Sequence, residues 1–205
     1  MNIVFDLDGT VLSSSERLFK LFNHLVPDSQ LTSDQYWALK FSNMTNEKIL
    51  KNYFNYNDQQ TTFFLDDWMK LIESEDFLSY DSLIDGALSY LIKLSKEANL
   101  HLCTARQSKE KLYAQMDRLG LHGIFQNILV TEQKSPKEHL ISTFIPDISR
   151  NDWIIGDTGK DIQTGKALGI KTCAVLSGFT NKFNLLKYNP DKVISDITCF
   201  NIIKN

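Results

Sequence analysis

The most restrictive feature of the sequence is the alternation of short apolar runs with helix-like segments from Gly86 onward. Apolar residues between the runs recur at helical spacing, as in Leu112, Met116 and Leu119. Strands that alternate with helices form βαβ units and a parallel sheet. A run such as Trp153-Ile154-Ile155 is typical of a strand buried on both faces. We therefore predict an α/β fold with a parallel sheet flanked by helices, whose strands from this region are 99–103, 128–131, 153–155, 171–176 and 193–194.

One more strand is predicted at the N-terminus, where the apolar run Ile3-Val4-Phe5 ends in the polar turn Asp6-Leu7-Asp8-Gly9-Thr10. The segment 14–80 differs, because its aromatic and aliphatic residues repeat at helical spacing throughout. We expect a bundle of about four helices there, with the aromatic side chains in its core. The chain is thus predicted to form an α/β core from residues 1–13 and 81–205, with the helical segment 14–80 inserted after the first strand.

Composition and charge exclude several classes of protein. The chain has 205 residues with 22 Lys and Arg against 25 Asp and Glu, and it lacks the basic blocks of a nucleic-acid binder. No apolar run approaches the roughly 20 residues of a membrane-spanning helix. The N-terminus lacks the pattern of a signal peptide. Cys103, Cys173 and Cys199 lack the spacing of a zinc site and are expected to be reduced core thiols. We expect a cytoplasmic protein without nucleic-acid or membrane partners.

Reactive side chains follow four of the predicted strands, where the carboxyl ends of a parallel sheet bind ligands. They are Asp6, Asp8 and Thr10, then Thr104 and Arg106, then Lys134 and Lys137, and finally Asp157 and Asp161. Clustered carboxylates repel one another unless a cation offsets their charge, and oxygen ligands of this kind suit Mg²⁺. A magnesium ion and a lysine would attract a phosphoryl group, which a carboxylate can attack. The turn at Gly9 would offer backbone N–H groups to a phosphate, and Thr104 a hydroxyl.

The residues at these strand ends resemble the motifs of the haloacid dehalogenase superfamily of hydrolases, in its phosphoglycolate-phosphatase-like branch. Residues 5–12, FDLDGTVL, resemble the first motif, Thr104 the second, and residues 156–162, GDTGKDI, the fourth. The usual Lys-Pro-x-Pro form of the third motif is absent. Lys137 is favoured for that position because it lies one turn before an apolar helical pair, and Lys134 is the alternative. The resemblance covers essentially the whole chain and implies a Rossmann-like core with a small helical (C1-type) cap at 14–80.

The resemblance also implies a role for each residue. Asp6 would be the nucleophile, and Asp8 the acid and base that serves the leaving alcohol and then water. Asp6, the backbone carbonyl of Asp8, and Asp157 would hold Mg²⁺, with Asp161 in support. The phosphate would be bound by Asp6, Gly9, Thr104, Ala105 and either Lys137 or Lys134. We expect hydrolysis of a small phosphorylated metabolite, a phosphate monoester, through an aspartyl-phosphate, by a monomer or weak dimer.

Three other functions remain open from the sequence. The first is a phosphotransferase or sugar-phosphate mutase of the same superfamily, against which Thr10 after Gly9 favours a phosphatase. The second is a receiver-like phospho-acceptor, and the third a non-catalytic protein that binds phosphate. The segment 41–48 resembles the family's substrate-specificity loop in position. Lys48 and Arg17 are candidate contacts to an anionic leaving group.

Overall fold

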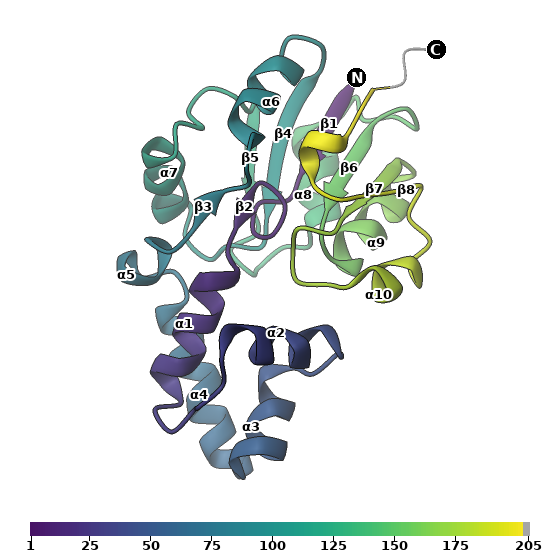
Figure 1. The fold of residues 1–205 in the computed structure, drawn as a ribbon. Coiled ribbons are helices and arrows are strands. Elements are labelled where there is room, and N and C mark those ends of the chain that lie inside the picture. Colours follow the sequence, from purple (N-terminus) through teal and green to yellow (C-terminus); the bar gives the residue numbers. More distant parts are fainter. Residues whose placement is uncertain (203–205) are drawn as a thin grey trace. The chain divides into compact units, whose positions relative to one another are not determined.

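The computed structural model describes residues 1–202 and divides the chain into two compact units. The core unit consists of Met1–Ser13 and the chain from Ser82 onward, and the inserted unit of Ser14–Asp81 (Figure 1). The boundary expected from the sequence lies one residue earlier, between 80 and 81. No helix of residues 1–202 combines the length and the apolar character that crossing a membrane requires.

Six parallel strands form the sheet of the core unit, in the order β5-β4-β1-β6-β7-β8. Their bounds are β1 (Asn2–Phe5), β4 (Asn99–Thr104), β5 (Asn127–Val130), β6 (Trp153–Gly156), β7 (Lys171–Val175) and β8 (Lys192–Ile194). The first strand therefore lies in the middle of the sheet, between β4 and β6. Strand order reverses at this point, which is where ligands bind in open parallel sheets. The predicted α/β fold is confirmed.

Helices cover both faces of this sheet (Figure 1). They are α6 (Ala87–Leu94), α7 (Lys109–Arg118), α8 (Lys137–Phe144) and α9 (Gly159–Leu168). Alternate side chains of a strand point to opposite faces. Accordingly, Ile3 and Phe5 pack in the cluster that holds the apolar residues of α6 and α7, whereas Val4 packs with Ile141 of α8. Burial on both faces explains why three consecutive residues of β1, Ile3, Val4 and Phe5, are apolar.

Several elements were not predicted, because they are too short to show a hydrophobic period. Two-residue strands β2 (Leu12–Ser13) and β3 (Ser82–Leu83) pair antiparallel. They lie where the chain leaves and re-enters the core unit, so the two connections run side by side. A short helix α10 (Lys182–Leu186) and a 3-10 turn, η1 (Ile197–Cys199), complete the core unit. The prediction of three core thiols is wrong for Cys199, which lies in this turn and is exposed, while Cys103 and Cys173 are buried.

The inserted unit contains five helices rather than about four. They are α1 (Ser15–Leu25), α2 (Ser33–Phe41), α3 (Asn46–Phe54), α4 (Asp58–Leu71) and α5 (Glu75–Leu78), of which the last is a single turn. The expected aromatic core is present. The ring of Phe22 lies 4.9 Å from that of Tyr36, 6.0 Å from Phe54 and 5.8 Å from Phe64, measured between centroids. Such pairs contribute about 0.5–1.5 kcal/mol each beyond simple burial.

Candidate active site

The loop that follows β1 brings Asp6 and Gly9 to the carboxyl end of the sheet. The backbone N–H of Asp6 donates to the carbonyl of Ile155 in β6, at 2.9 Å, so the chain is still held at the strand end. Gly9 has a φ of +83°, and a Cβ atom there would lie 2.6 Å from Oδ2 of Asp157. A side chain at this position is therefore excluded by both backbone conformation and space. The glycine lets the loop after β1 approach Asp157 closely.

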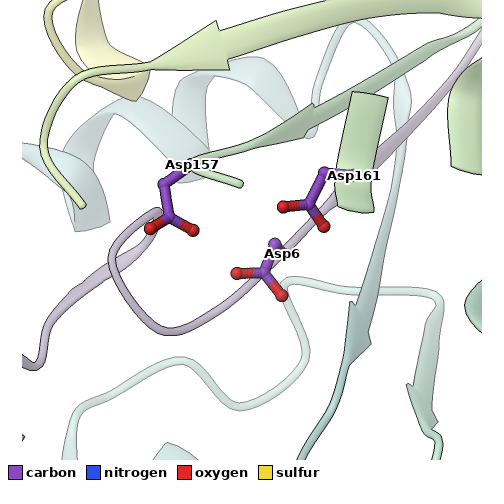
Figure 2. Close-up of side chains that lie close together, drawn as sticks. All are labelled: Asp6, Asp157 and Asp161. Atoms are coloured by element: carbon purple, nitrogen blue, oxygen red, sulfur yellow. The ribbon is translucent and has the colours of Figure 1, made fainter. Parts of the chain in front are cut away.

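Three buried carboxylates, those of Asp6, Asp157 and Asp161, meet where β1 and β6 end. Each offers an oxygen within 4.8 Å of the others, and Figure 2 shows the three carboxylates close together. Burial raises the pKa of Asp6 to about 7, against the attraction of Lys137 and with repulsion from Asp161. Burial, followed by repulsion from Asp6 and Asp161, also raises the pKa of Asp157. The ionised cluster is therefore electrostatically unfavourable unless cations neutralise its negative charge.

Lys137 supplies one such cation. Its Nζ donates to Oδ1 of Asp6 and to Oδ1 of Asp161, both at 2.6 Å. Burial disfavours the ammonium, but the two carboxylates outweigh it and raise the pKa of Lys137. Lys134 is placed differently: its side chain is 77% exposed and its Nζ lies 3.8 Å from Glu132. Of the two candidate lysines, the structure brings only Lys137 to the carboxylates.

The second contacts of the carboxylates fix their orientation. Oδ2 of Asp161 accepts from the backbone N–H of Thr158 at 3.1 Å and from its hydroxyl at 2.6 Å, which caps α9. Oδ2 of Asp157 accepts from the backbone N–H of Phe179 at 2.7 Å. Oδ1 of Asp157 is buried and has no hydrogen-bond partner among residues 1–202. A buried carboxylate oxygen is unfavourable without a partner, so this oxygen marks where a second cation would bind.

The donor set fits a hard divalent cation such as Mg²⁺. Its atoms are carboxylate oxygens, which such ions prefer, and three carboxylates face only one described ammonium. Asp6 and Asp157 are the residues whose carboxylates could hold the ion, together with the backbone carbonyl of Asp8 as the resemblance implies. Asp161 is engaged by Lys137 and by the cap of α9, which suits the supporting position expected for it.

Asp8 lies in the same loop, and an arginine holds it. The Nε and Nη2 of Arg106 donate to the two carboxylate oxygens of Asp8, at 2.5 and 2.6 Å. Sequence reasoning noted Arg106 at a strand end but gave it no role. The sequence did contain one sign of this contact. Arg106 comes two residues after Thr104 at the end of one strand, and the acidic loop that holds Asp8 follows another.

The remaining predicted residues lie at the same edge of the sheet. Thr104 is the last residue of β4, is buried, and accepts a hydrogen bond at its carbonyl from the N–H of Thr131 at 3.0 Å. Ala105 follows it and is exposed. Thr10 is buried, and its hydroxyl has no hydrogen-bond partner among the described residues. Four strand ends thus contribute to one locus, and the roles of these residues in binding phosphate stay predictions.

The two cations expected to contact a leaving group lie in the inserted unit. Arg17 on α1 forms a buried ion pair with Asp81, with Nε 3.3 Å from Oδ1, and their side chains are 3% and 0% exposed. Its charge is therefore engaged within that unit. Lys48 on α3 is exposed.

Two known proteins are similar to this chain over most of its length. A phosphoglycolate phosphatase of Mesorhizobium japonicum is 25% identical over 207 residues, which span 94% of this chain and 89% of that protein. The pyrophosphatase PpaX of Bacillus pumilus is 22% identical over 214 residues, covering 95% of this chain and 93% of that protein.

Solved structures share the fold. A haloacid dehalogenase-like hydrolase from Streptococcus pneumoniae superimposes with a TM-score of 0.75 at 22% identity, covering 94% of this chain and 92% of that one. The hydrolase YfnB from Bacillus subtilis, solved bound to magnesium, gives a TM-score of 0.66 at 20% identity, covering 95% and 94% of the two chains. The model of the family described as "Haloacid dehalogenase-like hydrolase" matches residues 3–175, which include every strand end of the site. With that match over most of its length, the chain belongs to the haloacid dehalogenase-like hydrolases.

Proposed function

We propose that the protein is a Mg²⁺-dependent phosphatase that hydrolyses a small phosphate monoester through an aspartyl-phosphate on Asp6. The observation that carries this proposal is the imbalance of charge at the site. Lys137 contacts two of the three buried carboxylates, those of Asp6 and Asp161, and Oδ1 of the third, Asp157, has no partner among residues 1–202. The names of the two relatives, a phosphoglycolate phosphatase and a pyrophosphatase, support phosphoryl chemistry.

Asp6, Asp157 and the backbone carbonyl of Asp8 would hold the magnesium ion. When bound, the ion supplies a Lewis acid that neutralises charge on the phosphoryl oxygens and favours the ionised form of the carboxylates. The ammonium of Lys137 already touches Asp6 and adds a second positive charge beside the transferred group. Thr104 and the backbone N–H groups of the Gly9 turn would orient the phosphate.

The reaction has two steps that balance at these residues. A carboxylate oxygen of Asp6 forms a bond to phosphorus, the ester P–O bond breaks, and the carboxyl proton of Asp8 passes to the leaving oxygen. Water then attacks the phosphorus of the aspartyl-phosphate, and the Asp8 carboxylate takes a proton from that water. The Asp6–phosphorus bond breaks, which releases inorganic phosphate and returns both carboxyl groups to their starting forms.

The proposed partner is a small phosphorylated metabolite in the cytoplasm, and the proposed assembly a monomer or weak dimer. A net charge of −3 gives no general attraction to nucleic acids or acidic membrane surfaces, which supports this assignment. Phosphoglycolate and pyrophosphate are the first substrates to compare, because they are named in the relatives.

The test is hydrolysis of p-nitrophenyl phosphate with and without Mg²⁺, by the wild type, Asp6→Asn and a control, Asp117→Asn. Asp117 is an exposed aspartate of α7, so its substitution leaves the site intact. We expect turnover that requires Mg²⁺, vanishes in Asp6→Asn and persists in the control. Wild-type protein that binds Mg²⁺ yet hydrolyses neither this ester nor a panel of phosphorylated metabolites would overturn the proposal.

A second measurement examines the nucleophile itself. Beryllium fluoride mimics a phosphoryl group on a carboxylate, and the proposal expects its adduct on Asp6 in a crystal grown with Mg²⁺. An adduct on another carboxylate would overturn the mechanism while leaving phosphatase activity possible.

A further inference from the structure

The contact between Arg106 and Asp8 is a two-pronged fork. Nε and Nη2 of the guanidinium donate to different oxygens of the carboxylate, at 2.5 and 2.6 Å. The side chain of Arg106 is 4% exposed and that of Asp8 is 18% exposed. A planar fork of this kind fixes the plane of a carboxylate as well as its position, which a lysine cannot do. The orientation of Asp8 is therefore set from outside its own loop.

The guanidinium is itself held in place. Its Nη2 also donates to Oε1 of Gln115, at 3.1 Å, and Gln115 is a buried residue of α7. Arg106 follows β4, and β4 pairs with β1, from whose end Asp8 projects. A chain of contacts thus runs from Gln115 of α7 through Arg106 to the carboxylate of Asp8.

We infer that Arg106 is a positioning residue for the reaction, and that Gln115 orients it. An ionised carboxylate offers about four lone-pair directions, and the fork uses two of them. One prong on each oxygen fixes the plane and the position of the carboxyl group, so the fork decides from which side Asp8 exchanges its proton with the leaving oxygen or with water. This inference rests on the proposed function, because it takes Asp8 as the acid and base of that reaction.

A positioning role for Arg106 predicts different kinetic effects from a role in binding substrate or in joining two loops. Because Arg106 acts through Asp8, its loss should lower kcat and leave KM almost unchanged. The loss should also be larger for an alkyl phosphate, whose leaving group needs a proton, than for p-nitrophenyl phosphate. A purely structural ion pair would lower kcat equally on both substrates.

The experiment is a double-mutant cycle on Arg106→Met and Asp8→Asn, measured with Mg²⁺ on p-nitrophenyl phosphate and on glycerol phosphate. Acid–base catalysis by a positioned group is worth about 10²–10⁴-fold, and we expect Arg106→Met to lose about 10–100-fold of kcat on the alkyl ester. The double variant should fall within about threefold of Asp8→Asn alone, since contacting residues that act together are not additive. Losses that multiply in the double variant would overturn the inference.

Two further variants keep the test decisive if Arg106→Met folds poorly. Arg106→Lys retains the charge but not the fork, and we expect it to stay within about threefold of Arg106→Met. Gln115→Met leaves the fork without its anchor, and we expect a smaller loss of kcat at constant KM. Full activity in both variants would overturn the inference.

The control is Arg118→Met. Arg118 is an exposed arginine of α7, the helix that also carries Gln115, and this variant should retain the wild-type kcat. The outcomes also separate this inference from the proposed function. A wild type without Mg²⁺-dependent turnover overturns both. An active wild type that loses its turnover in Asp6→Asn, together with multiplying losses in the cycle, overturns only the role of Arg106.

Discussion

The core unit and the inserted unit each hold a partly buried lysine, and the two lysines have opposite surroundings. In the core unit, Nζ of Lys137 lies 2.6 Å from Asp6 and 2.6 Å from Asp161, and these carboxylates raise its pKa. In the inserted unit, Nζ of Lys40 donates to the amide oxygen of Asn46 at 3.1 Å. Burial lowers the pKa of Lys40 to about 8. No carboxylate among residues 1–202 forms an ion pair with Lys40.

The difference shows that the charged groups beside a lysine, rather than its burial alone, decide whether its pKa is raised or lowered. Carboxylates around Lys137 keep its charge in place, so the core unit holds a permanent cation where the phosphoryl group is proposed to react. Lys40 donates instead to a neutral amide oxygen, that of Asn46, which also accepts from the hydroxyl of Tyr36. Its charge therefore lowers the stability of the inserted unit.

The largest effect is expected from Lys137→Met. Removal of the ammonium leaves Asp6 and Asp161 facing each other and takes a positive charge from the reacting group. Loss of one electrostatic donor of this kind lowers kcat by about 10²–10³-fold. The measurement is the Mg²⁺-dependent hydrolysis of p-nitrophenyl phosphate, with thermal unfolding to show that the variant is folded.

Lys134→Met is the matched control, because the same substitution is made three residues earlier, in the loop that leads into α8. Its side chain is 77% exposed, and we expect kcat within about twofold of the wild type and stability within about 0.5 kcal/mol. Equal losses in the two variants would remove the distinction between the lysines of this motif.

The next effect concerns the carboxylate that Lys137 does not reach. If Oδ1 of Asp157 binds Mg²⁺, the ion should stabilise the protein, by about 2.7 kcal/mol at a hundredfold excess over its Kd. Asp157→Asn should lose most of this gain while the metal-free protein stays folded. The measurement is the shift of Tm on adding Mg²⁺, with Asp117→Asn as the control that keeps the full shift. An undiminished shift in Asp157→Asn would place the ion elsewhere.

The positions of the site residues could be predicted because the sheet is parallel. Asp6 and Asp157 follow buried strands, and the carboxyl ends of neighbouring parallel strands meet. The choice between Lys134 and Lys137 could be favoured but not decided, because it depends on where α8 begins. The loop before it passes through two left-handed residues, Glu132 and Gln133, with φ of 47° and 56°. Neither is a glycine or asparagine, so the pattern gives no sign of this path.

The contact of Arg106 with Asp8 and the partial burial of Lys40 were not predictable, for a different reason. The fork of Arg106 depends on how a long side chain extends from one strand end to the loop of the next, which hydrophobic spacing does not encode. Lys40 lies in the last turn of α2, where a lysine is ordinary for the helix dipole and is read as exposed. Burial by tertiary packing decides both cases.

Lys40→Met is expected to stabilise the protein. A pKa lowered from 10.5 to about 8 corresponds to a charge that is disfavoured in the folded state at neutral pH. At about 1.4 kcal/mol per pKa unit, and allowing for partial exposure, the variant should gain about 1–3 kcal/mol of unfolding free energy at pH 7. Urea unfolding measures the gain.

The control for this substitution is Lys70→Met in the same unit. Nζ of Lys70 lies 2.9 Å from Asp67, and its side chain is 70% exposed, so its removal should leave the free energy of unfolding almost unchanged. A Lys40→Met variant less stable than the wild type would mean that packing of the aliphatic chain outweighs the buried charge.

The smallest effect is a pH dependence with a sign specific to Lys40. Below pH 8 the lysine is charged in both the folded and unfolded states, and its penalty is present in full. Between about pH 8 and 10.5 the folded state releases the proton that the unfolded state still holds, so stability rises with pH over this window. The stability difference between Lys40→Met and the wild type should therefore shrink by about 1 kcal/mol from pH 7 to pH 9.5.

Lys137 contributes nothing to the pH dependence in this window. Its pKa is raised, so its stabilisation is lost only above the pKa that a lysine has in the unfolded chain. Urea unfolding at both pH values measures the change, and a difference that stays constant would show that Lys40 keeps an ordinary pKa, which would erase the contrast between the two units.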